Sequence, residues 1–329
     1  MKDDKQFSGV AGGVIEHDHN HDGIDRRGFL KCMAWAGTGA VCVIEGGVLK
    51  SAALASHLGK DKMSAKSGQL TFAQISDSHM GFNKPANPDV VATLKAAVDK
   101  INALPHPPEF ILHTGDITHL STPEQFDTVD QILKATGKEV FFVPGEHDVL
   151  NDDGAMFRER YARQATGGGW YSFDKGGAHF IGLVNVLNLK AGGLGTLGPE
   201  QLQWLQDDLR AVKHSTPIVV FAHIPLWTVY PQWGWGTDDS AQALGYLKKY
   251  GSVTVLNGHI HQTMQKVEGN VTFHTACSTA FPQPAPGKAD GPGPMKVPAE
   301  MLRKVLGITD VNYVQRRHAL ALVDSTLES

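Results

Sequence analysis

Five apolar, strand-like stretches of this sequence are each followed at once by acidic or imidazole side chains. In chain order they end in Asp77-Ser78-His79, Gly115-Asp116, Glu146-His147-Asp148, His223 and Gly258-His259-Ile260-His261. A single such ending is usually a turn or a hydrogen-bonded structural residue. Five of them indicate a common site, because the carboxyl ends of strands in an open α/β sheet lie along one edge.

The chemistry of this set of side chains predicts bound cations. Converging carboxylates repel one another, and each buried ion costs several kcal/mol unless it is compensated. Histidine does not supply that compensation, because free imidazole is mostly uncharged at neutral pH. Mixed nitrogen and oxygen ligands favour Zn, Mn or Fe over Ca or Mg. The candidates outnumber the four ligands of one tetrahedral ion, so they suit two ions that share a carboxylate.

Alternating strands and helices precede and connect the first of these endings. Strands are expected at residues 70–76, 109–114 and 139–143, with amphipathic helices at 88–104 and 122–137 between them. The second helix has Pro near its start and Gly at its end, as helix termini favour. A β-α-β-α-β order predicts a largely parallel sheet with right-handed crossovers.

The second half of the chain requires a second sheet. Residues 170–186 predict a hairpin that turns at Gly176-Gly177, and residues 198–213 predict an amphipathic helix. Further strands are expected at residues 216–224, 253–260, 271–279 and 318–326. The Pro- and Gly-rich stretch 282–298 is interpreted as a surface loop, with a place beside the cleft as the alternative.

The first 55 residues differ from the rest of the chain and predict an export signal. Residues 25–31, "DRRGFLK", are typical of a twin-arginine signal, and a small-residue stretch follows up to an Ala53-Leu54-Ala55 cleavage pattern. A membrane anchor or an ordinary N-terminal helix is the alternative, but Glu45 and Lys50 argue against a stable membrane span. We therefore expect removal of residues 1–55 by way of the twin-arginine export machinery, and a periplasmic or secreted protein.

The rest of the chain is expected to form a linker and one catalytic domain. Residues 56–69 are polar and predict a linker, and residues 70–329 follow as a single domain. The chain has 329 residues, 41% apolar residues and a net charge of -4. That composition supports a large core and offers no overall basic excess for binding nucleic acid.

The motifs "DSH", "GDIT", "GEHD" and "GHIH", with His223 between the last two, resemble those of the calcineurin-like metallophosphoesterase superfamily. The resemblance covers residues 70–265, and "SDSHMG" is similar to bacterial phosphodiesterases of the cyclic-nucleotide type. It implies an α/β fold: a four-layer α/β/β/α sandwich of two mixed sheets flanked by helices. It also implies hydrolysis of a small phosphomonoester or phosphodiester through a hydroxide that two metal ions share.

The resemblance further implies a role for each site residue. Asp77, His79 and His261 hold one metal ion, Asp116 bridges both, and Glu146, His223 and His259 hold the second. His147 is expected to be catalytic, by stabilising the phosphoryl group or protonating the leaving oxygen. Asp148 is expected to orient that region, with a helix N-cap as the alternative.

Glu146 departs from the resemblance, because the superfamily has Asn at this position. In one reading Glu146 binds the second ion and adds a negative charge, which favours a trivalent ion such as Fe(III). In the other it turns away and the site holds one ion or none. A non-catalytic metal-binding or scaffold protein on the same fold is accordingly the alternative function. The aromatic stretch 225–239 is open to two interpretations, a rim over the substrate or part of the core.

Overall fold

The protein is described here from a computed structural model, in which the chain divides into two units, Met1–Leu58 and Gly59–Ser329. The described residues are 40–45, 48–53, 69–162, 165–187, 189, 192–314 and 320–328. In the first unit, β1 (Ala40–Glu45) pairs antiparallel with β2 (Val48–Ala53). The arginine pair of the expected signal, the last two residues of its cleavage pattern, and all but the last residue of the linker lie outside the described residues, and the signal and linker stay predictions.

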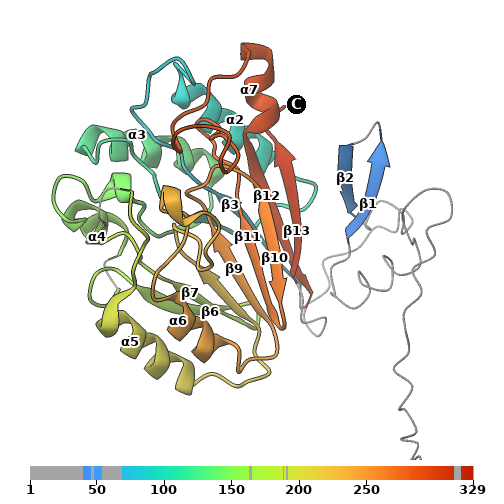
Figure 1. Cartoon of the computed structure of the whole chain (residues 1–329). Coiled ribbons are helices and arrows are strands. Elements are labelled where there is room, and N and C mark those ends of the chain that lie inside the picture. The colour runs from blue at the N-terminus through green and yellow to red at the C-terminus, as the bar shows by residue number, and fades with distance from the viewer. Residues whose placement is uncertain are drawn as a thin grey trace, which may run out of the picture. The chain divides into compact units, whose positions relative to one another are not determined.

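One sheet of the second unit has five strands in the order β13-β12-β3-β4-β5 (Figure 1). β3 (Gln69–Ile75), β4 (Phe110–His113) and β5 (Glu139–Phe142) are parallel, as their helical connections predict. β12 (Gly307–Val314) and β13 (Leu320–Thr326) extend the sheet in antiparallel fashion beside β3.

The other sheet has six strands in the order β10-β11-β9-β8-β7-β6. Its four inner strands are parallel, and an antiparallel strand lies at each edge. The strands are β6 (Tyr171–Lys175), β7 (Ala178–Gly182), β8 (Ile218–Phe221), β9 (Val253–Asn257), β10 (Met264–Glu268) and β11 (Val271–Thr275).

Helices cover the outer face of each sheet. α2 (Val90–Asn102), α3 (Pro123–Leu133) and α4 (Ala155–Tyr161) share one apolar cluster with the five-stranded sheet. α5 (Gly198–Arg210) and α6 (Ser240–Leu247) share a second cluster with the six-stranded sheet. Among the described residues, no helix combines the length and apolar character that crossing a membrane requires.

A third apolar cluster lies between the two sheets and completes the four layers. Phe72 and Phe110 of one sheet pack against Phe180 of the other, all three fully buried. The predicted α/β/β/α sandwich of two mixed sheets is therefore confirmed.

The sequence did not predict every element. The strands β10 and β12 and the short helices α6 and α7 (Ala299–Val305) were missed. β10 is an edge strand with mostly exposed polar side chains, so it lacks the alternation that marks a half-buried strand. Several predicted strands also ran too far, because β8 ends at Phe221 and β9 at Asn257, where the site turns begin. The described residues also include single turns of 3₁₀ helix at Lys134–Thr136, Glu146–Asp148 and Pro231–Trp233.

Candidate metal centre

The turns at the strand ends hold their side chains in an unusual backbone conformation. In the described part of the chain, seven non-glycine residues have positive φ, and five of these are predicted metal ligands. These five are Asp77, His79, Asp116, His259 and His261, with φ between 40° and 70°. Such conformations cost about 1–3 kcal/mol each and cluster at functional sites. The strained backbone thus marks the same turns that the sequence singled out.

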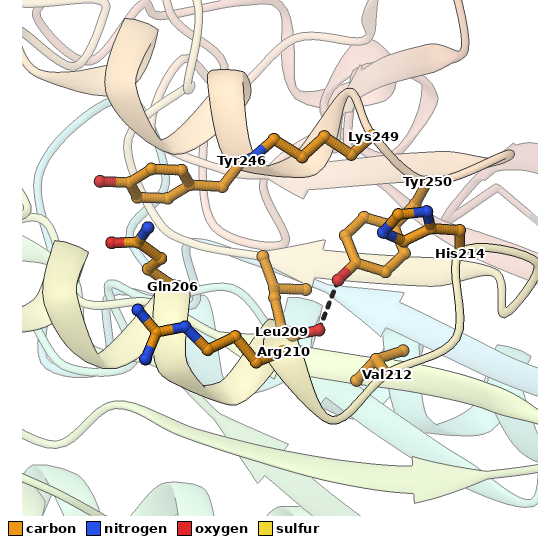
Figure 2. A pocket seen from close by; sticks show the side chains of 8 residues that line it. All are labelled: Gln206, Leu209, Arg210, Val212, His214, Tyr246, Lys249 and Tyr250. Atoms are coloured by element: carbon orange, nitrogen blue, oxygen red, sulfur yellow. Dashed lines mark hydrogen bonds between the residues drawn. The ribbon is translucent and has the colours of Figure 1, made fainter.

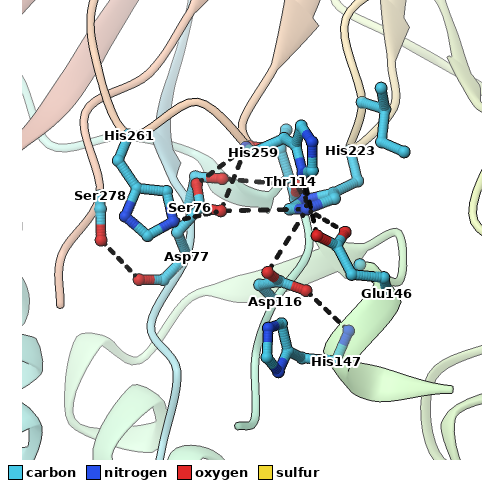
Figure 3. A network of polar contacts seen from close by, with 12 residues as sticks. Ser76, Asp77, Thr114, Asp116, Glu146, His147, His223, His259, His261 and Ser278 are labelled. Carbon is cyan, nitrogen blue, oxygen red and sulfur yellow. Dashed lines mark hydrogen bonds and ion pairs between the residues drawn. The ribbon is translucent and has the colours of Figure 1, made fainter. Parts of the chain in front are cut away.

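Three of the predicted ligands form a first triad, from the ends of β3 and β9. His261 Nε2 lies 3.3 Å from Asp77 Oδ1 and 3.2 Å from His79 Nε2. All three side chains are buried. His259 donates its backbone N–H to the Asp77 carboxylate at 3.1 Å, which ties the two strand ends together (Figure 3).

Three more predicted ligands form a second triad, from the ends of β5, β8 and β9. Glu146 Oε2 lies 2.9 Å from His223 Nε2, and Glu146 Oε1 lies 3.1 Å from His259 Nδ1. His223 Nε2 and His259 Nδ1 are 3.3 Å apart. Glu146 therefore points into the site and does not turn away (Figure 3).

Asp116 lies between the two triads. Its Oδ2 is 3.4 Å from His79 Nε2 and 3.5 Å from His223 Nε2, so it faces one imidazole of each triad. The turn after β5 approaches it closely, because a Cβ atom at Gly145 would lie 2.1 Å from Asp116 Oδ1. Only glycine at that position leaves the bridging carboxylate in place.

The spacing of these atoms fits metal ions. Ligand atoms that are about 2.0–2.1 Å from a tetrahedral ion lie roughly 3.3 Å from one another. His223 Nδ1–H donates to the Thr114 carbonyl at 2.7 Å, and His261 Nδ1–H donates to the Phe281 carbonyl at 2.5 Å. Each Nε2 therefore presents a lone pair to a carboxylate, an arrangement that is repulsive without a cation between them.

The acid–base properties of the residues lead to the same conclusion. Burial disfavours a charged His223, yet Asp116 and Glu146 hold its pKa well above the usual value. Burial likewise disfavours an ionised Glu146, but His259 and His223 hold its pKa well below the usual value. A proton on His223 thus offsets the negative charge of the neighbouring carboxylates. A metal cation would offset it better, because imidazole nitrogen and carboxylate oxygen atoms are metal ligands.

His147 and Asp148 occupy different positions. His147 Nδ1–H donates to the His119 carbonyl at 2.7 Å, so its Nε2 remains for the site. Asp148 is fully buried and accepts from the backbone amides of Gly145 and Thr118 at 2.9 and 2.8 Å. It does not cap α4, whose first-turn amide at Met156 bonds to Asp152 instead.

His119 is a site residue that the sequence analysis missed. Its ring stacks on His147 with centroids 4.8 Å apart, and it lines the same cavity. Burial, His147 and Lys84 together lower the pKa of His119 to about 4, so its ring is neutral at pH 7. The signal was available, because His119 stands three residues after Asp116 in the same turn.

A cavity of about 300 Å³ opens beside the two triads. Trp235 of the aromatic stretch lines it, whereas Trp227 packs on Phe273 and Trp233 packs beneath Trp235. The aromatic stretch 225–239 thus contributes both to the rim of the cavity and to the core. The loop 282–298 is mostly exposed, as the sequence predicted, and it also borders the cavity, because its residues Gln283, Pro292 and Pro294 line it.

A second hollow, of about 320 Å³, lies between the ends of α5 and α6 and is lined by Arg210, His214, Lys249 and two tyrosines (Figure 2). Its cations lie near the carboxyl ends of those helices, where the helix dipole attracts positive charge. No carboxylate lines this hollow. The candidate metal ligands among the described residues therefore lie at the first cavity and not at this hollow.

Two ligand triads joined by a shared carboxylate, at the meeting edges of a four-layer α/β sandwich, form the arrangement of a dinuclear metal centre. The sequence profile of the calcineurin-like phosphoesterase family matches residues 70–263. The chain belongs to this family, and its site fits a dinuclear phosphoesterase.

The individual relatives have low sequence identity to this chain. A 3′,5′-cyclic-nucleotide phosphodiesterase from a Nostoc species is 24% identical over 218 residues, or 64% of this chain and 79% of the relative. A serine/threonine-protein phosphatase from mouse is 29% identical over 180 residues, which are 49% of this chain and 57% of the relative. A dimetal phosphatase structure from Danio rerio superimposes with a TM-score of 0.58 at 16% identity, over 79% of this chain and 99% of that one. This last similarity shows the fold.

Proposed function

We propose that the chain hydrolyses phosphoesters at a dinuclear metal centre built from Asp77, His79 and His261, from Glu146, His223 and His259, and from the bridging Asp116. The observation that carries this proposal is the position of Asp116 between two complete triads. One such triad would fit a single structural ion, but a carboxylate shared by two triads is the requirement of a two-metal site.

The metal ions and the residues around this centre have different proposed roles. When bound, two metal ions lower the pKa of water toward about 7 and neutralise charge on the phosphoryl oxygens. His147 is proposed to donate a hydrogen bond from Nε2 to the phosphoryl or leaving oxygen. Burial alone would lower the pKa of His147, but Asp116 and Glu146 raise it, which favours the protonated form of this donor.

Glu146 supports a particular metal composition. Asp77, Asp116 and Glu146 place three negative charges around the two ions, and both Glu146 oxygens face histidines of the second triad. We propose that Glu146 binds the second ion and that the extra charge favours a trivalent ion beside a divalent one, among Fe, Mn and Zn.

The substrate is proposed to be a small phosphodiester. The cavity of about 300 Å³ admits a small molecule rather than a folded partner. Support for a diester comes from the Nostoc relative, whose printed name is that of a cyclic-nucleotide phosphodiesterase. A panel of mono- and diesters compared by kcat/KM tests this preference.

The test of the main proposal combines metal analysis with turnover. Purified protein reconstituted with Mn or Fe should hold two ions per chain and hydrolyse a 4-nitrophenyl phosphodiester or monoester. Asp116→Asn should lower kcat by more than about a hundredfold and reduce the metal content, because the shared ligand loses its charge. Full activity of Asp116→Asn, or fewer than two ions in the wild type, contradicts the dinuclear scheme.

The same assay addresses the alternative of a non-catalytic metal-binding or scaffold protein. That alternative expects bound metal without turnover against any ester of the panel. His147→Asn serves as the matched variant, because it keeps the metal ligands and removes only the proposed donor. Turnover that falls while the metal count stays at two favours the enzyme.

We also propose export of the protein by the twin-arginine machinery to the periplasm or beyond. The support is the "DRRGFLK" stretch and the cleavage pattern that follows it. Replacing Arg26 and Arg27 together by Lys should leave the full-length chain in the cytoplasm of a bacterial host, while the unchanged sequence yields a shortened extracytoplasmic form. Equal export of both sequences, measured by cell fractionation, contradicts this proposal.

A further inference from the structure

The cavity beside the metal centre extends past the ligands into a part that the proposed chemistry does not use. This outer part is lined by Phe82, Lys84, His119, Trp235, Phe281 and Gln283, with two prolines of the loop 282–298. Lys84 is the one lysine or arginine among all the residues that line the cavity. A fixed positive charge therefore lies beside the reacting group but outside the ligand set.

The Lys84 side chain is exposed and lines the cavity. Among the residues that the structure describes, no carboxylate forms an ion pair with it and no acceptor bonds to it. Some other lysines of this unit are paired, for example Lys175 with Glu139 at 3.0 Å and Lys266 with Glu268 at 2.8 Å. The charge of Lys84 is thus free to bind an anion that enters the cavity.

The segment that carries Lys84 is held firmly against the site. Asn87 donates to the Ala280 carbonyl at 2.6 Å and to the Lys84 carbonyl at 3.0 Å through its backbone amide. Phe82 packs on Phe281 with ring centroids 4.3 Å apart, and both rings are buried. These contacts fix the backbone at Lys84 beside the cavity that its side chain lines.

Lys84 is also close to the residues that face the phosphoryl group. It contributes to lowering the pKa of His119, whose ring stacks on His147. Lys84 supplies a positive charge on this side of the cavity. The buried Phe82 and Phe281 rings line the same cavity and offer an apolar wall beside this charge.

We propose that Lys84 forms a subsite for a second anionic group of the substrate, a carboxylate or a phosphate on the part of the molecule that is not attacked. This inference rests on the proposed phosphoesterase function and specifies its substrate class. The small cavity limits the arm between the two groups to a few atoms, with its carbon atoms against Phe82 and Phe281. The preferred substrate is therefore a small phosphoester with at least one further negative charge.

The experiment compares matched 4-nitrophenyl phosphodiesters on the metal-loaded full-length protein. Their second arm is ethyl, 2-carboxyethyl, 2-phosphonoethyl or 2-ammonioethyl. For the wild type, kcat/KM should be highest with an anionic arm and lowest with the ammonium arm. Lys84→Gln should lower kcat/KM for the anionic arms on the order of tenfold, mostly through KM, and leave the ethyl ester unchanged. The carboxylate and phosphonate arms together identify which anion the subsite prefers.

Two further variants serve as controls. Lys84→Arg keeps the charge and should keep the preference, whereas Lys84→Glu should reverse it. Lys95→Gln removes an exposed charge on α2, away from the cavity, and should change none of the four rates. A binding measurement provides a second readout: the ratio of inhibition constants for methylphosphonate and phosphonoacetate should fall toward one in Lys84→Gln.

The outcomes separate this inference from the function on which it rests. Hydrolysis of the ethyl ester supports the phosphoesterase function by itself. An equal loss on all four esters in Lys84→Gln overturns the subsite, since Lys84 would then act on the reacting phosphoryl group. No loss on any ester overturns it as well. Should the wild type hydrolyse no ester and bind neither phosphonate, the proposed function and the subsite fall together.

Discussion

At the scale of single residues, Asp148 holds the turn that carries the bridging Asp116. Its Oδ2 accepts from the backbone amides of Ile117 and Gly145, and its Oδ1 accepts from the amide and hydroxyl of Thr118. Burial and the nearby Asp116 raise the pKa of Asp148 to about 6, against the lowering effect of these donors. The position of Asp116 thus depends on a carboxylate that itself faces no ligand atom of the triads.

We therefore expect Asp148→Asn to weaken the centre without removing a ligand. One side-chain oxygen is replaced by an NH₂ group, which cannot accept from the buried donors that it faces. Each donor left unsatisfied costs about 1–3 kcal/mol. The melting temperature and the metal content should both fall. Asp153→Asn, at an exposed turn position whose positive φ asparagine tolerates, should change neither. Unchanged metal retention in Asp148→Asn contradicts this role.

At the scale of elements, His179 joins three of them away from the metal centre. On β7, its Nδ1 lies 2.8 Å from Asp174 of β6 and its Nε2 lies 2.8 Å from Asp208 of α5. Burial alone would lower the pKa of His179, but these two carboxylates raise it. The charged imidazole therefore fastens α5 to the edge of its sheet.

The sign of the resulting pH dependence follows from this raised pKa. A group whose pKa is higher in the folded state makes its full contribution to stability at pH values below its pKa in the unfolded state, which is about 6.5 for histidine. It loses that contribution as pH rises through the folded value. The stability difference between wild type and His179→Gln should accordingly be largest near pH 5.5, on the order of 1–3 kcal/mol, and should shrink toward pH 9. Urea unfolding of both proteins at each pH measures it; a difference that grows with pH contradicts the ion-pair assignment.

At the scale of the whole second unit, the centre depends on how the two sheets pack. Asp77, His79 and Asp116 follow strands of the five-stranded sheet, whereas His223 and His261 follow strands of the six-stranded sheet. Their relative positions are set by the aromatic layer between the sheets. Phe110 is central there, 5.0 Å from the Phe72 ring and 5.4 Å from the Phe180 ring.

Phe110→Ala should therefore affect metal binding as well as stability. Removal of a buried phenyl ring costs about 3–5 kcal/mol, and the sheets can then shift relative to each other. Leu205→Ala is the control, because it removes a fully buried side chain from the helix-facing core of the other sheet. Both variants should melt at lower temperature, but only Phe110→Ala should lose metal faster to a chelator. Equal losses would show that the layer does not position the centre.

Much of the site was determined by the sequence alone. Motifs and periodicity predicted the strand ends that carry acidic and imidazole side chains and the need for two sheets, whereas the seven proposed ligands and the four-layer fold were implied by the family resemblance. The strand ends are local features, because an apolar run ending in a turn of Asp, Glu or His has the same meaning wherever the strand lies in the sheet. The Pro144-Gly145 step before Glu146 likewise indicated the sharp turn that brings this carboxylate to the edge.

Only the tertiary structure decided which of these residues meet and what surrounds them. His79 and His261 are 182 positions apart, and the packing of two sheets brings their Nε2 atoms to 3.2 Å. The same packing faces Asp148 toward backbone amides, and it brings Lys84 and three residues of the loop 282–298 to the wall of the cavity. Sequence spacing fixes geometry only within an element. Distances between elements depend on the shapes of buried side chains from distant parts of the chain, which no local pattern encodes.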